Sequence, residues 1–230
     1  MDQLQLKAIV AQKHLLKHPF YQLWLQGKLP KQALQQYSQQ YFQLVAHLPR
    51  FISTLHTNCD DEITRKQLTL NLMEEELGYG NGNIPHTTLW LDFAQELGVE
   101  NDQVKNASIL PATQNAINTM QEACQSSPQE GAAALYAYES QVPEISEEKI
   151  TALKEQYDMH SDKALRFFTV HAQADIKHRA VWTALTKRYA QTQLQRQQAE
   201  IAATKTRDAL WHLFDAMYDQ FVPNEIKTMC

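Results

Sequence analysis

Apolar residues recur every three or four positions along almost the whole chain, which is the spacing of helices that bury one face. Helices are therefore predicted over residues 2–17, 30–49 with a continuation toward 55, 61–77, 86–97, 111–124, 129–142, 146–157, 161–188 and 190–221. The clearest loop is GYGNGNIP at 78–85, because Gly, Asn and Pro favour turns. No segment alternates apolar and polar residues as a strand would, and no repeat or long linker divides the sequence. We predict one all-α domain over residues 1–230, a bundle of about eight helices.

The composition excludes several classes of protein. The net charge is −5 and no cluster of Lys and Arg occurs, which argues against nucleic-acid binding. No apolar run reaches membrane-spanning length, and the N-terminus has no signal-peptide pattern. Cys59, Cys124 and Cys230 are scattered, as expected of reduced thiols. We expect a cytoplasmic protein that binds neither nucleic acid nor membrane.

The segment FFTVHAQADIKHRAVWTAL at 167–185 carries the most informative group of polar residues. At about 100° per residue, offsets of four and seven place His171, Asp175 and His178 on one face of a helix. Phe168 and Trp182 lie on or beside that face, so the polar groups project from an apolar stripe. Two imidazoles and a carboxylate suit iron, manganese or zinc. The alternatives are a polar stripe closed by hydrogen bonds, or a surface patch of histidines.

Other helices offer further ligands. Glu139 follows Leu135 by four residues, so it faces inward if that side of its helix is buried. The acidic run at 74–76 ends another helix, and His86 opens the next one. Spacing alone does not separate Glu75 from its neighbours, and an acidic helix end is often simply solvated. A glutamate such as Glu139 can also pair with a tyrosine or lysine. Carboxylates and imidazoles from several helices are what a two-metal site in a bundle requires.

Four segments resemble the CADD proteins, members of the haem-oxygenase-like di-metal oxidases: HPFYQLW at 18–24, LMEEELGYGNGNIPHTTLW at 72–90, ALYAYESQVPEISEEKI at 134–150 and FFTVHAQADIKH at 167–178. The similarity runs from about residue 10 to 190. It implies an all-α, haem-oxygenase-like bundle of seven to eight helices and a homodimer. It also implies six ligands for an Fe/Fe or Mn/Fe pair: Glu75, His86, Glu139, His171, Asp175 and His178.

The resemblance further implies an activity. CADD-like proteins supply para-aminobenzoate for folate synthesis, cutting it from one of their own tyrosines with dioxygen as co-substrate and an external reductant. The matching tyrosine here is Tyr21 and the matching amino donor is Lys149, while Tyr37 and Tyr138 match other tyrosines near the metals. Phe167 stands where that family has a further tyrosine. A desolvated lysine has a lowered pKa and is a competent nucleophile, so the residue types fit this chemistry.

Two other functions compete with this one. A di-metal oxidase of the same fold would act on an external small-molecule substrate, such as a fatty acid or an amino acid. A metal-free protein of the same fold would serve only to bind a partner. A thiaminase-like hydrolase is not expected, because nothing in the sequence marks Cys124 as an activated nucleophile.

Overall fold

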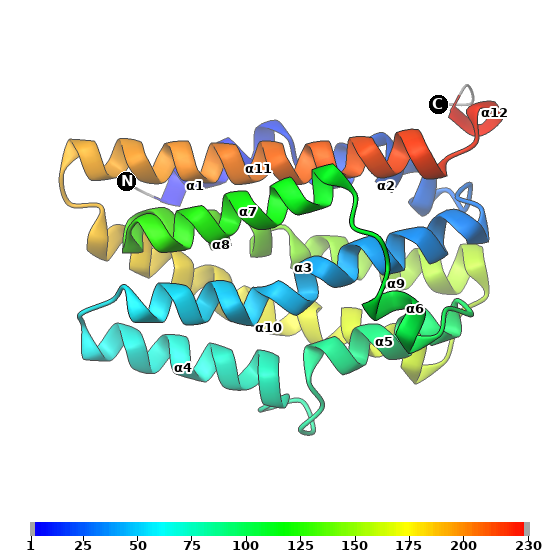
Figure 1. The fold of residues 1–230 in the computed structure, drawn as a ribbon, viewed down its shortest axis with the longest axis horizontal. Coiled ribbons are helices and arrows are strands. Elements are labelled where there is room, and N and C mark those ends of the chain that lie inside the picture. The colour runs from blue at the N-terminus through cyan, green and yellow to red at the C-terminus, as the bar shows by residue number, and fades with distance from the viewer. Residues whose placement is uncertain (1–2, 228–230) are drawn as a thin grey trace.

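The computed structural model describes residues 3–227, which form helices and connecting turns with no strand. Figure 1 shows the helices α1 Gln3–Gln12, η1 Leu15–Lys17 (a 3-10 helix), α2 Pro19–Leu25, α3 Lys31–Thr57, α4 Glu62–Leu77, α5 His86–Glu96, α6 Asn101–Lys105, α7 Pro111–Ser126, α8 Pro128–Glu139, α9 Val142–Tyr157, α10 Asp162–Tyr189, α11 Gln193–Phe221 and α12 Asn224–Lys227. The predicted all-α class is confirmed.

The predicted number of helices was too low. Within the described residues the structure has twelve α-helices, ten of them seven residues or longer, where seven to eight were predicted. One cause is the N-terminal segment, predicted as a single helix over 2–17. Its helix ends at Gln12, because His14 is extended and its ring accepts the backbone N–H of Leu16. Residue 2 lies outside the described residues. Pro19 then opens α2, since proline fits the first turn of a helix.

The helices pack in layers around one large hydrophobic core cluster. In Figure 1, α11 runs along the top edge, α4 and α5 along the bottom edge, and α3 between them. Both α10 and α11 pack on α8, which buries every residue from Gly131 to Glu139. Alanines at four of those positions let neighbouring helices approach closely. The last residue of α8, Glu139, is therefore held deep in the bundle.

The loop between α4 and α5 determines how those two helices meet. Gly78 ends α4 in the left-handed conformation, with φ of 66°, where a side chain would overlap the backbone of Ile84. Arg166 on α10 donates to the carbonyl oxygen of Asn81 at 2.9 Å. The loop is thus closed on itself and tied to α10, so the end of α4 and the start of α5 lie against the same helix.

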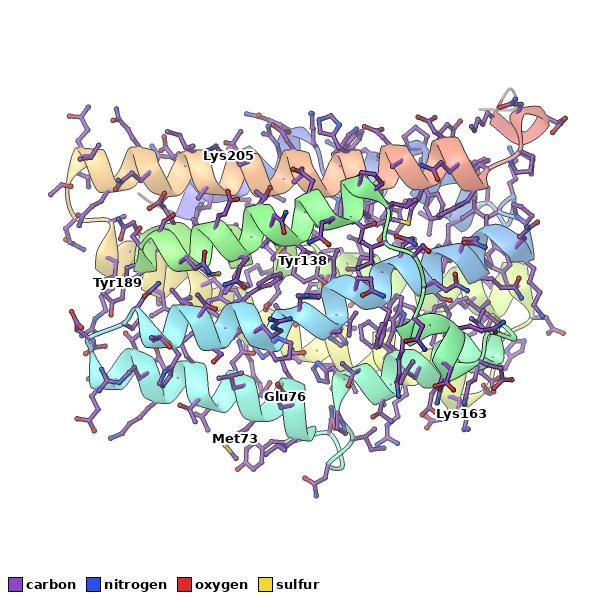
Figure 2. All side chains as sticks on the ribbon, viewed as in Figure 1. Met73, Glu76, Tyr138, Lys163, Tyr189 and Lys205 are labelled. Carbon is purple, nitrogen blue, oxygen red and sulfur yellow. The ribbon has the colours of Figure 1, made fainter. Side chains whose placement is uncertain are left out.

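Most charged side chains lie on the outside of the bundle, and aromatic side chains fill much of its interior. Figure 2 labels Glu76, Lys163 and Lys205, which are exposed, and Tyr138, which is buried. Cys59 and Cys124 are free thiols, whereas Cys230 lies outside the described residues. In the part of the chain that the structure describes, no helix combines the length and the apolar character needed to cross a bilayer.

Candidate metal centre

The six residues that the resemblance selects converge in the middle of the bundle, all of them buried. They come from four helices: α4, α5, α8 and α10. They form two groups of three, and within each group the ligand atoms lie within 4.8 Å of one another. The first group is Glu75, His86 and His171, and the second is Glu139, Asp175 and His178. Their role as metal ligands stays a prediction, whereas their convergence is a property of the structure.

In the first group, Oε2 of Glu75 lies 2.8 Å from Nδ1 of His86. The rings of His86 and His171 are 4.4 Å apart. His171 donates from Nδ1 to the carbonyl oxygen of Phe167 at 2.7 Å, which leaves its Nε2 as the unprotonated nitrogen. Burial would raise the pKa of Glu75, but the adjacent His86 holds it below its ordinary value. Burial would lower the pKa of His86, and the Glu75 carboxylate raises it instead.

In the second group, Nδ1 of His178 lies 3.1 Å from Oδ1 of Asp175 and 3.2 Å from Oε2 of Glu139. Trp182 donates its indole N–H to the same Glu139 oxygen at 2.8 Å. The other ring nitrogen of His178, Nε2, lies 2.8 Å from Oε2 of Glu74. Burial raises the pKa of Asp175. It would lower the pKa of His178, but three surrounding carboxylates raise that pKa well above its ordinary value.

Several atoms of these groups lack the partners that burial requires. One oxygen each of Glu75, Glu139 and Asp175 is buried without a hydrogen-bond partner. Nδ1 of His86 also makes no hydrogen bond, although the Glu75 oxygen is only 2.8 Å away. Buried carboxylate oxygens without a partner are costly unless they bind a cation. Three carboxylates and three imidazoles in two groups therefore fit a pair of divalent iron or manganese ions.

A small enclosed cavity of about 20 Å³ lies against both groups. That volume is enough for one water-sized molecule. Its walls combine carboxylate and imidazole groups with apolar and phenolic side chains. They are Tyr41, Val45, Leu48, Glu75, Tyr138, Glu139, Val142, Phe167, His171 and Asp175. A cavity of this size is smaller than an aromatic or aliphatic organic molecule.

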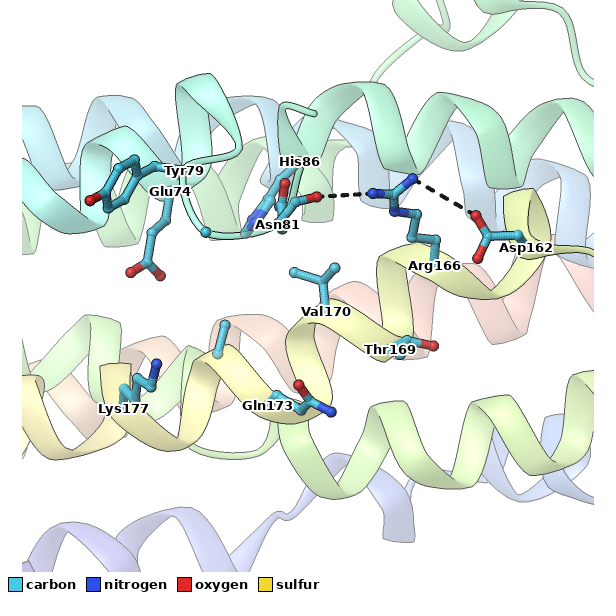
Figure 3. A pocket seen from close by; sticks show the side chains of 12 residues that line it. Glu74, Tyr79, Asn81, His86, Asp162, Arg166, Thr169, Val170, Gln173 and Lys177 are labelled. Carbon is cyan, nitrogen blue, oxygen red and sulfur yellow. Dashed lines mark hydrogen bonds and ion pairs between the residues drawn. The ribbon is translucent and has the colours of Figure 1, made fainter. Parts of the chain in front are cut away.

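A second, much larger space is an open groove of about 610 Å³ between the 78–85 loop and α10. Figure 3 shows Glu74 and Lys177 across this groove from each other, with Arg166 bound to the loop and to Asp162. The groove reaches the candidate centre only at His86 and beside Glu74. It connects solvent with the first group at His86, and with Glu74, which contacts His178 of the second group.

The predicted substrate tyrosine and amino donor also meet. Lys149 on α9 is 2 % exposed, and its Nζ lies 2.6 Å from Oη of Tyr37. The same Nζ lies 4.8 Å from the ring centre of Tyr21 and 4.6 Å from that of Trp24. Burial lowers the pKa of Lys149 well below its ordinary value, and no carboxylate of the described chain pairs with it. Tyr21 is fully buried beside it, and burial raises its pKa well above the ordinary value.

A series of tyrosine rings connects this pair with the small cavity. The ring centres of Tyr37 and Tyr41 are 5.3 Å apart, and those of Tyr41 and Tyr138 are 6.4 Å apart. Both Tyr41 and Tyr138 line the cavity. The residues predicted from the sequence thus occupy one continuous region of the core, which extends from Lys149 and Tyr21 to the two ligand groups.

Three residues of this region were missed in the sequence. Glu74 contacts His178, although the acidic run at 74–76 gave no reason to assign it a role beside Glu75. Trp182 was placed on the apolar stripe of its helix, which its burial bears out, but it also donates to Glu139. Its place on the same helical stripe as the histidines was the available signal. Tyr41 gave no sequence signal apart from its spacing of four from Tyr37.

Comparisons with known proteins agree with the geometry. A protein family described as iron-containing redox enzyme matches residues 35–212. The 4-aminobenzoate synthase of Nitrosomonas europaea is 36% identical, over 96% of this chain and 93% of that protein. The 4-aminobenzoate synthase of Chlamydia pneumoniae is 36% identical, over 95% of each. A solved domain of unknown function from Shewanella denitrificans, with a haem oxygenase-like fold, superposes with a TM-score of 0.80 at 17% identity, over 96% of this chain and 94% of that one. The chain therefore belongs to the haem-oxygenase-like family of iron-containing redox enzymes.

Proposed function

We propose that this protein is a 4-aminobenzoate synthase that makes its product from its own Tyr21, with Lys149 as the amino donor. The observation that carries the proposal is the buried amine of Lys149, 4.8 Å from the ring centre of Tyr21 and without a carboxylate partner in the described chain. Relatives named 4-aminobenzoate synthase align over nearly the whole sequence. A lysine that served only stability would be expected at the surface or in an ion pair.

The proposed reaction changes both residues. The Cα–Cβ bond of Tyr21 breaks, Cα takes a hydrogen and is left as a glycine residue, and Cβ is oxidised by four electrons to the carboxyl group of the product. At the other end of the ring, the Lys149 nitrogen replaces the phenol oxygen, which leaves as water, and the bond from that nitrogen to Cε breaks as Cε is oxidised by two electrons to an aldehyde. Two molecules of dioxygen accept these six electrons and two more from an external reductant, and are reduced to water. A chain that loses these groups cannot react twice, so each chain turns over once.

The side chains around the pair favour each part of this reaction. Burial lowers the pKa of Lys149 well below its ordinary value and so favours the uncharged amine, the form with the lone pair that attacks. Trp24 and Phe168 lie 4.6 and 5.3 Å from that nitrogen and exclude water from it. Tyr37 holds the nitrogen in place through its hydroxyl. When bound, a pair of iron or manganese ions would supply the reducing electrons that activate dioxygen.

The size of the cavity at the ligand groups supports an internal substrate. About 20 Å³ accommodates dioxygen but no organic substrate. An oxidase acting on an external fatty acid or amino acid needs a pocket of several hundred Å³ at its metals. The open groove of about 610 Å³ is the one observation that favours this second function, since it touches His86. It lies outside the ligand groups, however, and not between them.

The remaining alternatives have less support. A metal-free interaction protein would carry three buried carboxylates with unpaired oxygens for no purpose. A thiaminase-like hydrolase needs an activated thiol, whereas burial raises the pKa of Cys124 to about 12. The homodimer implied by the resemblance stays a prediction, which sedimentation velocity of the purified chain tests.

Whole-protein mass spectrometry tests the proposal directly. The chain is incubated with Fe(II), a reductant and oxygen, and peptides containing residues 21 and 149 are mapped. We expect loss of the Tyr21 side chain, modification of Lys149 and at most one para-aminobenzoate per chain. Tyr21→Phe should abolish the product, while Tyr189→Phe, a partly buried tyrosine at the far end of α10 (Figure 2), should not. Product from Tyr21→Phe, or more than one product per chain, contradicts self-cleavage and favours an external substrate.

A further inference from the structure

His178 differs from the other two candidate histidine ligands because both of its ring nitrogens face carboxylates. Nδ1 faces Asp175 and Glu139 at 3.1 and 3.2 Å. Nε2 faces Glu74 at 2.8 Å, the shortest of the three separations. The ring is 4 % exposed, so solvent does not replace any of these partners.

Glu74 approaches this ring from a different helix and a different side. It precedes Glu75 on α4, and successive residues of a helix point about 100° apart. Glu75 therefore belongs to the first ligand group, while Glu74 crosses to α10 and contacts the second. Its side chain is 29 % exposed and lines the groove in Figure 3. The Glu74 carboxylate thus lies between the open groove and Nε2 of the buried His178 ring.

The position of the proton on this ring decides whether it can bind a metal. A neutral imidazole carries one proton, and the nitrogen without it is the ligand. With Nε2 protonated, Nδ1 is bare and faces Asp175 and Glu139. In the opposite tautomer, Nδ1–H would donate to those carboxylates, and the bare nitrogen would face away from the group. A carboxylate acceptor at Nε2 selects the first tautomer and fixes the ring plane.

We propose that Glu74 is a positioning residue: it accepts the Nε2–H of His178 and thereby leaves Nδ1 directed at the second metal position. The inference rests on the proposed metal centre and adds a seventh side chain to the six ligands. Glu74 does not itself complete either group of three. Because it contacts only the second group, its removal should weaken one metal position and leave the other unchanged.

The simpler interpretation is that Glu74 is only a solvated glutamate at an acidic helix end. Glu76 provides the matched control, because it carries the same charge at the same helix end and is exposed (Figure 2). A general effect of negative charge on cation binding would appear equally in Glu74→Ala and Glu76→Ala. An effect through the His178 ring would appear only at Glu74. Glu74→Gln removes the charge but keeps an oxygen that accepts the proton, so it separates charge from positioning.

The experiment is equilibrium dialysis of the full chain against Mn(II), with elemental analysis of bound metal. We expect two ions per chain for the wild type, Glu76→Ala and Glu74→Gln. Glu74→Ala should keep one ion at wild-type affinity and bind the second about 10–100-fold more weakly. Metal-free circular dichroism and thermal melts verify that each variant folds. If Glu74→Ala does not fold, Glu74→Ser, whose hydroxyl is too short to reach the ring, replaces it.

A second measurement determines directly which nitrogen of the His178 ring carries the proton. In zinc-loaded protein with ¹⁵N-labelled histidine, long-range ¹H–¹⁵N spectra report which nitrogen of His178 is protonated. We expect a slowly exchanging Nε2–H in the wild type and in Glu74→Gln, and its loss in Glu74→Ala. Equal affinity of Glu74→Ala and wild type for both ions overturns the inference while leaving the proposed function intact. The inference is likewise overturned if Glu76→Ala weakens Mn(II) binding as much as Glu74→Ala does. A wild type that binds fewer than two ions removes the metal centre, and the inference with it.

Discussion

Replacing Lys149 by methionine should stabilise the metal-free protein even though it destroys the proposed activity. The lysine is among the largest fully buried side chains, and its amine is surrounded by five aromatic rings at 4.6–5.4 Å. Methionine has a similar length and an apolar sulfur that packs well against aromatic rings. The substitution Lys149→Met therefore removes a desolvated amine without leaving a large cavity.

The sign of the effect follows from the depressed pKa of the lysine. Below its ordinary value of 10.5 the unfolded chain carries the charged amine, whereas the folded chain holds it uncharged down to a lower pH. The unfolded state therefore binds more protons in that window, and wild-type stability falls as the pH falls from 10.5 toward the folded pKa. Each unit of pKa depression costs the folded state about 1.4 kcal/mol at neutral pH. Methionine carries no such cost.

One contribution opposes the gain. The 2.6 Å hydrogen bond between Lys149 and Tyr37 is lost, which costs about 1 kcal/mol for a typical hydrogen bond. Because burial lowers the pKa well below its ordinary value, the relief of desolvation should exceed this loss. We expect a net gain of about 1–2 kcal/mol at pH 7. For a chain of this size, each kcal/mol raises Tm by about 2–4 °C.

Differential scanning calorimetry of metal-free wild type and Lys149→Met, from neutral pH to the ordinary pKa of lysine, measures this effect. The difference in Tm should be largest at neutral pH and should shrink toward pH 10.5, where the amine is uncharged in both states. Lys154→Met, an exposed lysine on the same helix, is the control and should change stability by less than about 0.5 kcal/mol. A variant less stable than wild type at pH 7, or a difference that does not vary with pH, would refute the reasoning.

Three further substitutions test other parts of the site. Trp182→Phe keeps an aromatic ring, although a smaller one, and removes the N–H that Glu139 accepts. Metal-free stability should therefore fall by about 1.5–3 kcal/mol in urea unfolding, and an unchanged midpoint would contradict this. Tyr41→Phe should leave the metal content unchanged but slow para-aminobenzoate formation roughly tenfold, which corresponds to about 1.4 kcal/mol. The reason is that Tyr41 belongs to the series of tyrosines between the small cavity and Tyr21, and the substitution removes its hydroxyl. An unchanged single-turnover rate would exclude that role. Gly78→Ala should destabilise by more than about 1–2 kcal/mol and weaken Mn(II) binding, since its φ is 66° and a side chain meets backbone. In Gly80→Ala, at φ of 86°, the added side chain has no neighbouring atom within 4 Å. This substitution should cost only the free energy of placing alanine in the left-handed backbone conformation.

The sequence predicts those parts of the site that depend on local periodicity. His171, Asp175 and His178 share a face because one helix carries all three, and α10 does run unbroken through them. Glu139 could be placed on an inward face from its spacing to Leu135. Spacing does not distinguish the adjacent residues Glu74 and Glu75 in the same way. Only tertiary packing places Glu75 against His86 and Glu74 against His178.

Contacts between distant segments could not be predicted from spacing. Lys149 and Tyr21 are both ordinary in their local sequence, and only the resemblance paired them. Their meeting depends on how α9 packs on α2. The boundaries of the N-terminal helices were also missed, because a histidine that caps a backbone N–H looks like any polar residue of a helix.

Under the proposed function, the division of roles among helices would allow one chain to be both catalyst and substrate. The candidate ligands lie on α4, α5, α8 and α10, whereas Tyr21 lies on α2 and Lys149 on α9. Loss of the Tyr21 ring would leave a cavity in a fully buried site, and removing a large aromatic side chain from a core costs about 3–5 kcal/mol. Against a total stability of about 5–15 kcal/mol, the spent chain would remain folded only by a small margin. It would keep its ligands, since no ligand shares a helix with either reactant. Under the proposed function, such a chain would be inactive and more easily unfolded, and therefore more readily degraded than the unreacted protein.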